Sequence, residues 1–230
     1  MPCTPRRRRT LITAGAAAAA VVVVGTVAGV TLSQPDETAT SPNPTTPAQT
    51  STAPTAAAVE SACGLRGTPG DGTEGATTAT WQAAGIVSLP VSKTDGPGKR
   101  VPTGPWSCYT RTPSGAVLAG ITIALRADGV AENWQDVVRQ QTVPGPGQDA
   151  ALNGPLANAE QVTLRGYTVA GYSPDRATIR YYLHTPASDA SCTTEVQWSG
   201  GDWRLVLGDD GSTSSGCAQG APVDFTPWGP

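Results

Sequence analysis

The chain has 230 residues and a net charge of −3, which suits one ordinary domain with attachments. All 18 acidic residues lie after Ser33, where only 11 of the 15 basic residues remain, so that part carries a net charge of −7. Because binding to nucleic acids depends on basic surfaces that neutralise phosphates, this balance excludes a nucleic-acid partner for the part after Ser33.

The chain begins with a basic tail and a long uncharged run. Residues 1–10 hold the consecutive arginines Arg6–Arg9, and residues 11–32 contain no charged side chain. At ~1.5 Å per residue this run spans a hydrocarbon core of ~30 Å, and the arginines before it predict a cytoplasmic N-terminus. We therefore predict a cytoplasmic tail and a single-pass transmembrane signal-anchor in the lipid bilayer of the cell membrane, with the rest of the chain outside. A cleaved signal peptide, including one of the twin-arginine kind, and a buried soluble helix are the alternatives.

A polar segment follows the apolar run. Residues 33–60 are rich in Ser, Thr, Pro and Ala and contain no aromatic residue. Such a segment cannot bury enough apolar surface to offset its chain entropy, so we predict a disordered linker that proline keeps extended. It either gives the next part reach across the envelope or is a tolerated spacer. Residues 61–230, which hold all six tryptophans, form the predicted extracytoplasmic domain.

Four cysteines lie in the predicted exported domain, at Cys63, Cys108, Cys192 and Cys217. An even number of cysteines in an oxidising compartment favours two disulfides, and four cysteines allow three pairings. We favour Cys63–Cys108 with Cys192–Cys217, because each pair falls within one half of the domain. A metal site is not expected, since the chain has no C-x-x-C motif and a single histidine, His184.

The first half of this domain is predicted to hold loops and a helix. Residues 81–89 fit a short strand or turn, and residues 90–105 are typical of an exposed loop. Residues 116–126 carry apolar side chains at helical spacing, with Ser114 as the N-cap and Asp128-Gly129 as the end. A buried strand is the competing interpretation of this run.

The second half changes from helical spacing to alternation. Two more helices are predicted over residues 130–141 and 148–152. Beyond Gln161 the period is two, and the alternation places Tyr181 on one face of a strand and Arg180 on the other. The predicted strands cover residues 162–172, 177–185, 193–198 and 203–207. We therefore predict an α+β domain in which helices are followed by a curved antiparallel sheet of about four strands. A C-terminal aromatic pair, Phe225 and Trp228, is expected to pack back onto it.

The candidate site residues are few. His184 could act as a general base beside an acid, but a lone histidine on a strand is usually structural. Residues 209–212 hint at a cation site, but the spacing of an EF-hand and its distal Glu are absent, which favours a solvated loop. Trp198 and Trp203, across a tight turn, either stack on a ligand or pack into the core. We expect no catalytic, cofactor-binding or metal-binding residue, and the candidate surface for a ligand or partner is formed by Tyr182, His184, Trp198 and Trp203.

Two stretches resemble known proteins. Residues 104–116 (GPWSCYTRTPSGA) resemble a turn-into-helix signature of bitopic membrane proteins from conjugative elements of high-GC Gram-positive bacteria. Residues 198–205 (WSGGDWRL) resemble the last hairpin of cone-shaped domains of the nuclear-transport-factor-like superfold, which also serves the bitopic assembly factor of type IV secretion systems. The resemblance implies a cone-like sheet and a scaffold that contacts itself or other subunits near a transfer channel. It carries over no catalytic residue.

These observations lead to three expectations about function. The first is a non-catalytic, membrane-anchored extracytoplasmic scaffold or interaction protein of a conjugative transfer or secretion apparatus, with envelope proteins or further copies of itself as partners. The second is an anchored or secreted module that binds a small ligand near His184 and the two tryptophans. The third is an enzyme, which an ordered pair of His184 and a carboxylate inside a cleft would favour.

Overall fold

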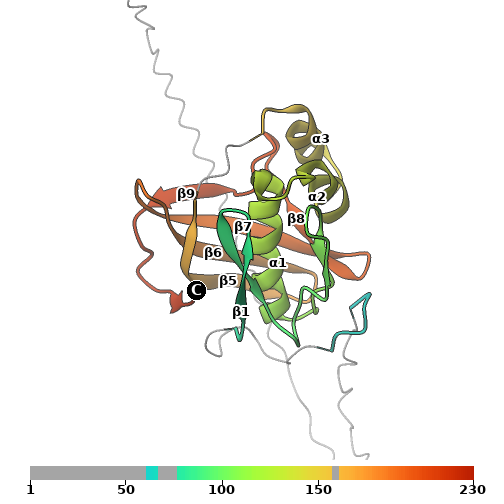
Figure 1. The fold of residues 1–230 in the computed structure, drawn as a ribbon, viewed down its shortest axis with the longest axis horizontal. Coiled ribbons are helices and arrows are strands. Elements are labelled where there is room, and N and C mark those ends of the chain that lie inside the picture. The colour runs from blue at the N-terminus through green and yellow to red at the C-terminus, as the bar shows by residue number, and fades with distance from the viewer. Residues whose placement is uncertain (1–60, 67–76, 157–160) are drawn as a thin grey trace, which may run out of the picture. The chain divides into compact units, whose positions relative to one another are not determined.

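The computed structural model describes residues 61–66, 77–156 and 161–230 (Figure 1). Its main sheet is antiparallel and has six strands in the order β10-β5-β6-β7-β8, with β9 pairing with β7 as well. Two small sheets, β1–β2 and β3–β4, and the helices α1 to α3 complete the described part. The bounds are β1 Thr80–Ala84, β2 Val87–Val91, β3 Lys99–Arg100, β4 Trp106–Ser107, α1 Pro113–Leu125, the π-helical turn η1 Arg126–Val130, α2 Trp134–Gln141, α3 Pro146–Asn153, β5 Thr163–Ser173, β6 Arg176–His184, β7 Asp189–Ser199, β8 Asp202–Val206, β9 Gly216–Gln219 and β10 Thr226–Pro227.

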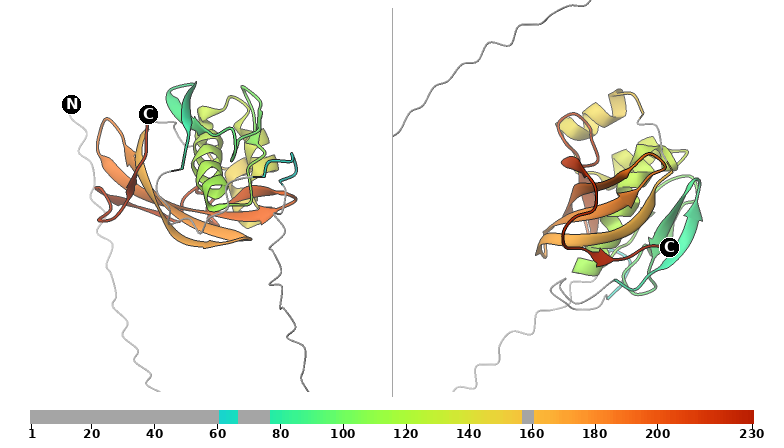
Figure 2. Two further views of the ribbon diagram at one scale, coloured as in Figure 1. Left: turned by 90° about the horizontal axis from the view of Figure 1, so that it is seen from below. Right: turned by 90° about the vertical axis from the view of Figure 1, so that its left-hand side faces the viewer.

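Helix α1 is the centre of the molecule. Its sequence is almost wholly apolar, and nearly every residue of it is buried, because the main sheet packs on one side and β2 on another (Figure 2). The hydroxyl of Thr112 accepts the N–H of Gly115 at 3.1 Å, and Pro113 occupies the first turn, where its missing N–H has no cost. The predicted helix is thus confirmed, but Thr112 caps it rather than Ser114. Gly129, at φ +98°, lies where the sequence predicted the end.

One face of the main sheet packs on α1. Ile179 and Tyr181 of β6 are fully buried, as are Val196 of β7 and Leu205 of β8, and the alternation predicted for β6 is confirmed. Each such side chain contributes roughly 1.5–3 kcal/mol through burial. The hydroxyl of Tyr181 donates to the carbonyl of Val117 at 2.7 Å, and this approach is open because Gly120 has no side chain there.

A buried arginine closes the loop between β3 and β4. Arg126, only 1% exposed, donates to the carbonyl oxygens of Val101, Pro102 and Gly104, and its guanidinium lies 4.7 Å from the centre of the Trp106 ring. Burial lowers the pKa of this guanidinium. The carbonyls and the ring together replace the water that the charge loses, so Arg126 is a structural residue.

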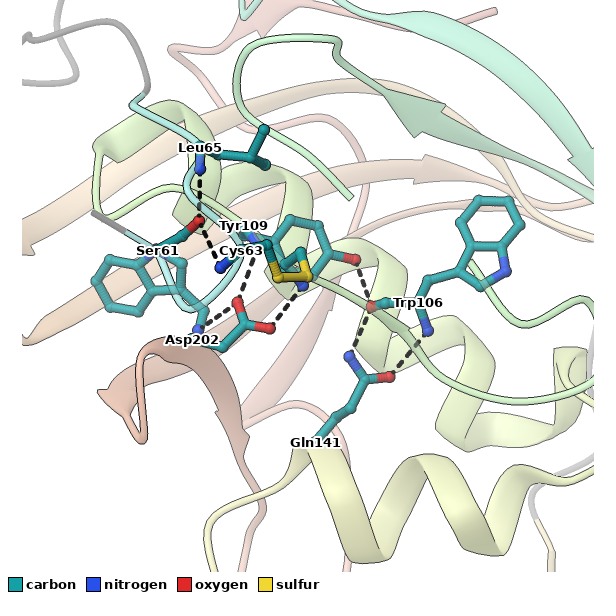
Figure 3. Close-up of a disulfide and its surroundings, with 9 residues drawn as sticks. Ser61, Cys63, Leu65, Trp106, Tyr109, Gln141 and Asp202 are labelled. Atoms are coloured by element: carbon teal, nitrogen blue, oxygen red, sulfur yellow. Dashed lines mark hydrogen bonds between the residues drawn. A yellow bond between two sulfur atoms is a disulfide. The ribbon is translucent and has the colours of Figure 1, made fainter. Parts of the chain in front are cut away.

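Both predicted disulfides are confirmed. Cys63 is bonded to Cys108, and Cys192 to Cys217. Figure 3 shows the first of these beside Asp202, whose carboxylate accepts the backbone N–H groups of Cys108 at 2.7 Å and of Tyr109 and Trp203 at 2.9 Å each. Burial raises the pKa of Asp202, and the three N–H donors oppose that shift. The segment before α1 is therefore held to β8 by a carboxylate and to Cys63 by a covalent bond.

The predicted fold class, helices followed by a curved, cone-like sheet of about four strands, is wrong. The main sheet has six strands, and the β1–β2 hairpin precedes α1. The extra strands β9 and β10 are short and do not alternate in hydrophobicity, so their sequence gives no period to detect. Tertiary contacts hold them: the Cys192–Cys217 bond fixes β9 to β7, and the buried Trp228, which packs back as predicted, follows β10.

Smaller corrections concern loops and helix starts. Residues 90–105 are not simply an exposed loop, because Asp95 is 4% exposed and accepts hydrogen bonds from the hydroxyls of Thr94 at 2.6 Å and Thr110 at 3.1 Å. The second helix begins at Trp134 rather than at residue 130, and the third begins at Pro146, since proline is well suited to a first turn.

Three predicted segments lie outside the described residues: the cytoplasmic tail 1–10, the transmembrane signal-anchor 11–32 and the linker 33–60. Within residues 61–66, 77–156 and 161–230, no helix combines the length and the apolar character that crossing a bilayer requires.

Candidate functional site

The main sheet has one face that no described helix covers. Figure 2 shows all three helices and the β1–β2 hairpin on one side of the sheet. The register places a set of mainly polar side chains on the opposite side, which we call the outer face. The outer face consists of Thr168 of β5, Arg176, Thr178, Arg180 and Tyr182 of β6, Thr193, Glu195 and Gln197 of β7, and Arg204 of β8.

The outer face carries guanidinium groups that carboxylates neutralise only in part. Arg176 forms an ion pair with Glu195 at 2.5 Å, whereas Arg180 is exposed and makes no ion pair with any described residue. Arg204 is half-buried and donates to the backbone carbonyl of Ser199 at 3.4 Å, and its charge acts to lower the pKa of Asp202. Arg165, in the bulge of β5, adds a positive charge that helps to lower the pKa of Asp189. The outer face is therefore positive although the domain is acidic.

The end of the helix side around α2 and α3 is acidic. Residues 126–156 and 207–213 contain six carboxylates and two arginines. Of these arginines, Arg126 is buried beneath the carbonyl groups that it binds and Arg139 pairs with Asp136 at 3.4 Å. The acidic residues are Asp128, Glu132, Asp136, Asp149, Asp209 and Asp210. The exposed cations of the helix side lie elsewhere, in and beside β2 and β3, so negative charge is concentrated at the α2–α3 end.

Two of the four predicted surface residues meet at one end of the outer face. The Nδ1 atom of His184 lies 2.7 Å from Oδ1 of Asp189, and the hydroxyl of Tyr182 donates to Oδ2 of the same carboxylate at 2.9 Å. The bond to Asp189 raises the pKa of Tyr182, and the bond to His184 is the main cause of a lowered pKa at Asp189. The side chains of His184 and Asp189 are 47% and 41% exposed, so water reaches both and the pair is not enclosed in a cleft. Such a pair can fix a surface geometry, but nothing around it holds a substrate.

The other two predicted surface residues lie elsewhere. Trp198 and Trp203 face each other across the β7–β8 pair on the side of α1, with ring centroids 5.4 Å apart. Trp203 is 1% exposed and its Nε1 donates to the carbonyl of Thr110 at 2.8 Å. Arg111 covers the Trp198 ring at 5.6 Å. The structure therefore puts the tryptophans in the core, at the other end of the sheet from His184.

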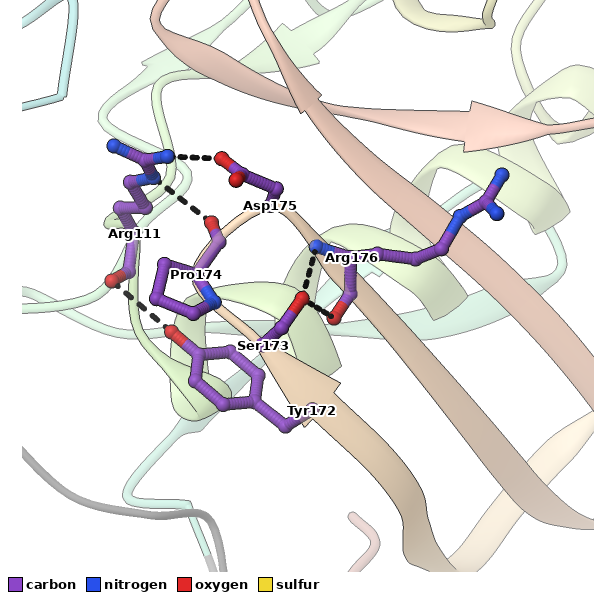
Figure 4. A network of polar contacts seen from close by, with 6 residues as sticks. All are labelled: Arg111, Tyr172, Ser173, Pro174, Asp175 and Arg176. Atoms are coloured by element: carbon purple, nitrogen blue, oxygen red, sulfur yellow. Dashed lines mark hydrogen bonds and ion pairs between the residues drawn. The ribbon is translucent and has the colours of Figure 1, made fainter.

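Arg111 also ties the β5–β6 turn to the segment before α1 (Figure 4). Its guanidinium pairs with Asp175 and donates to the carbonyl of Pro174 at 2.8 Å, while the hydroxyl of Tyr172 donates to the carbonyl of Arg111 at 3.3 Å. Because Asp175 is 75% exposed, this ion pair contributes little on its own. The network fixes the turn that precedes β6, the strand that carries two arginines of the outer face.

The loop at residues 209–212 is a turn held by its own side chains. Asp210 accepts the backbone N–H of Ser212 at 3.0 Å, and this bond together with the Ser212 hydroxyl lowers the pKa of Asp210. No group of three or more potential metal ligands gathers among the described residues. The hydrogen bonds explain the sequence of this loop without a cation.

Comparison with known proteins gives one match. Residues 42–223 match a family described as a domain of unknown function, DUF8175. The chain belongs to this family. No curated protein and no solved structure matches the chain. The match spans part of the predicted linker and nearly all of the described domain, and the family's description assigns no role, so the role of this DUF8175 domain has to be argued from its surfaces.

The sequence contained the signal for the outer face, although its importance was missed. Alternation placed Arg180, Tyr182 and His184 on one side of a strand, but only the register brings Arg176 beside Gln197 and Arg204. Pairing across β6, β7 and β8 is a long-range property that one strand cannot show.

Proposed function

We propose that this domain is a non-catalytic, extracytoplasmic interaction module that binds an envelope protein through the outer face. The observation that carries the proposal is that Arg176 and Arg180 are exposed, with Arg204 half-buried near them, on a sheet face that no described helix covers, in a domain that is acidic as a whole. Charged surfaces of this kind steer association and select partners of opposite charge. The partner is expected to present carboxylates, and the acidic α2–α3 end of a second copy is one such surface.

The location outside the membrane is part of the proposal. Two disulfides among the described residues support an oxidising compartment, because such bonds rarely persist in the cytosol. The uncharged run at residues 11–32 supports anchoring in the bilayer. The resemblance that suggested a transfer apparatus included a cone-like sheet, which this fold lacks, so the proposal names an acidic envelope protein without assigning it to that apparatus.

Site-specific photocrosslinking in membranes tests this function. A photoreactive residue at Thr178 of the full chain is expected to give a discrete crosslinked product whose yield falls at high salt, because screening weakens contacts between exposed charges. The same residue at the exposed position Glu132, on the helix side, identifies a second copy if the product has twice the mass of the chain. Equal background labelling at all positions, with no salt-dependent product, would overturn the proposal.

A further inference from the structure

A hollow of about 230 Å³ lies on the helix side of the domain, away from the outer face. Trp134 and Val138 of α2 and Ala150 and Ala151 of α3 form its walls, together with Leu207 beyond β8. An apolar cavity of ~150 Å³ holds one benzene molecule, so a hollow of this size suits a ligand with a single ring or a short branched chain.

The charges around the hollow all have one sign. Asp128 and Asp210 belong to its lining, and no basic side chain does so among the described residues. Ala150, Ala151 and Gly154 lie at the C-terminal end of α3, where the helix dipole is negative. A neutral or anionic ligand would not be attracted by this negative potential, whereas a cation would be.

Asp128 is the carboxylate best placed to receive that cation. The hydroxyl of Thr213 donates to its Oδ2 atom at 2.8 Å, which orients the carboxylate and leaves further acceptor positions open. Burial raises the pKa of Asp128, with the Thr213 bond opposing, so the ionised group has lost part of its hydration. A ligand ammonium would replace that hydration. The ring of Trp134 offers a second favourable contact for a cation.

We propose that this hollow binds a small organic cation, an ammonium carried on a compact apolar group, with the charge on Asp128 and the apolar group between α2 and α3. The site is separate from the outer face and goes beyond the interaction role proposed above. The chain can therefore lose one of these properties by mutation and keep the other.

Calorimetric titration of the full chain with two probes of equal shape tests the site. Benzylamine supplies the cation and benzyl alcohol replaces it with a neutral group. We expect benzylamine to bind saturably and about tenfold more tightly than benzyl alcohol, a difference of ~1.4 kcal/mol. Asp128→Asn is expected to remove that preference, while the matched variant Asp136→Asn, which changes an acidic residue of α2 outside the hollow, keeps it.

A second variant separates the hollow from general attraction to an acidic surface. Ala150→Phe fills the hollow without changing any charge, and it is expected to abolish the binding of both probes. Thermal melting of each variant checks that it is folded, and Ala150→Phe decides the question if Asp128→Asn does not fold. Three results would overturn the site. They are equal affinity of the wild-type chain for the two probes, tight benzylamine binding in Asp128→Asn or Ala150→Phe, and no saturable binding to the wild-type chain.

Discussion

The two faces of the main sheet are formed by the same strands but have different surroundings. On β6, Ile179 and Tyr181 are buried against α1, whereas Thr178 and Arg180, their direct neighbours in sequence, lie on the outer face. The inner face has few free polar groups and dense apolar contact, while the outer face has charge without cover. The buried face that stabilises the domain and the face proposed for binding are therefore one residue of register apart, and mutations on the two faces should have separable effects.

The largest loss of stability is expected for a substitution of Trp203, on the inner face. Its ring is 1% exposed and its Nε1 atom is bonded to Thr110, so Trp203→Ala would leave a cavity and an unpaired carbonyl. We expect a loss of about 4 kcal/mol in the free energy of unfolding, measured by denaturant titration of the full chain in detergent. Trp198→Ala, which removes the same side chain from a half-buried position, serves as the control and should cost clearly less. Equal losses would mean that burial on this face does not determine stability.

The second-largest loss of stability is expected for Asp202, the carboxylate that accepts three backbone N–H groups. In Asp202→Asn the new NH₂ group would face a backbone N–H that now donates to the carboxylate, such as that of Cys108. One buried donor would lose its partner, and we expect a cost of about 2 kcal/mol in the free energy of unfolding. Asp175→Asn, at a carboxylate that is 75% exposed, should change it by under ~1 kcal/mol.

The elements with strong local signals could be predicted from sequence. Helix α1, strand β6 and the two disulfides follow from apolar spacing, alternation and cysteine count. The short strands β9 and β10 could not be predicted, because a disulfide and the burial of Trp228 decide their position rather than their own side chains. The fold class failed for that reason.

The candidate site was predictable only in part. His184 and Tyr182 were placed correctly on one side of β6, and Asp189 joins them from β7. Trp198 and Trp203 were grouped with them because two tryptophans across a tight turn could stack on a ligand near His184. The histidine and tyrosine lie near one end of β7 and the two tryptophans near the other. The alternation within one strand does not show how strands pair, so it could not predict this distance.

The smallest effect on stability is expected on the outer face, where binding and stability can be measured separately. Arg180 is exposed and pairs with no described carboxylate, so Arg180→Gln should change the free energy of unfolding by less than ~0.5 kcal/mol. The same substitution, made together with Arg204→Gln, should lower the yield of the salt-dependent crosslink from Thr178, because the outer face loses two positive charges. Ile179→Ala, one residue away on the inner face, is the matched control: it should destabilise the chain by ~2–5 kcal/mol, and the fraction that remains folded should still form the crosslink. A crosslink that survives the double arginine variant unchanged would show that charge on this face does not select the partner.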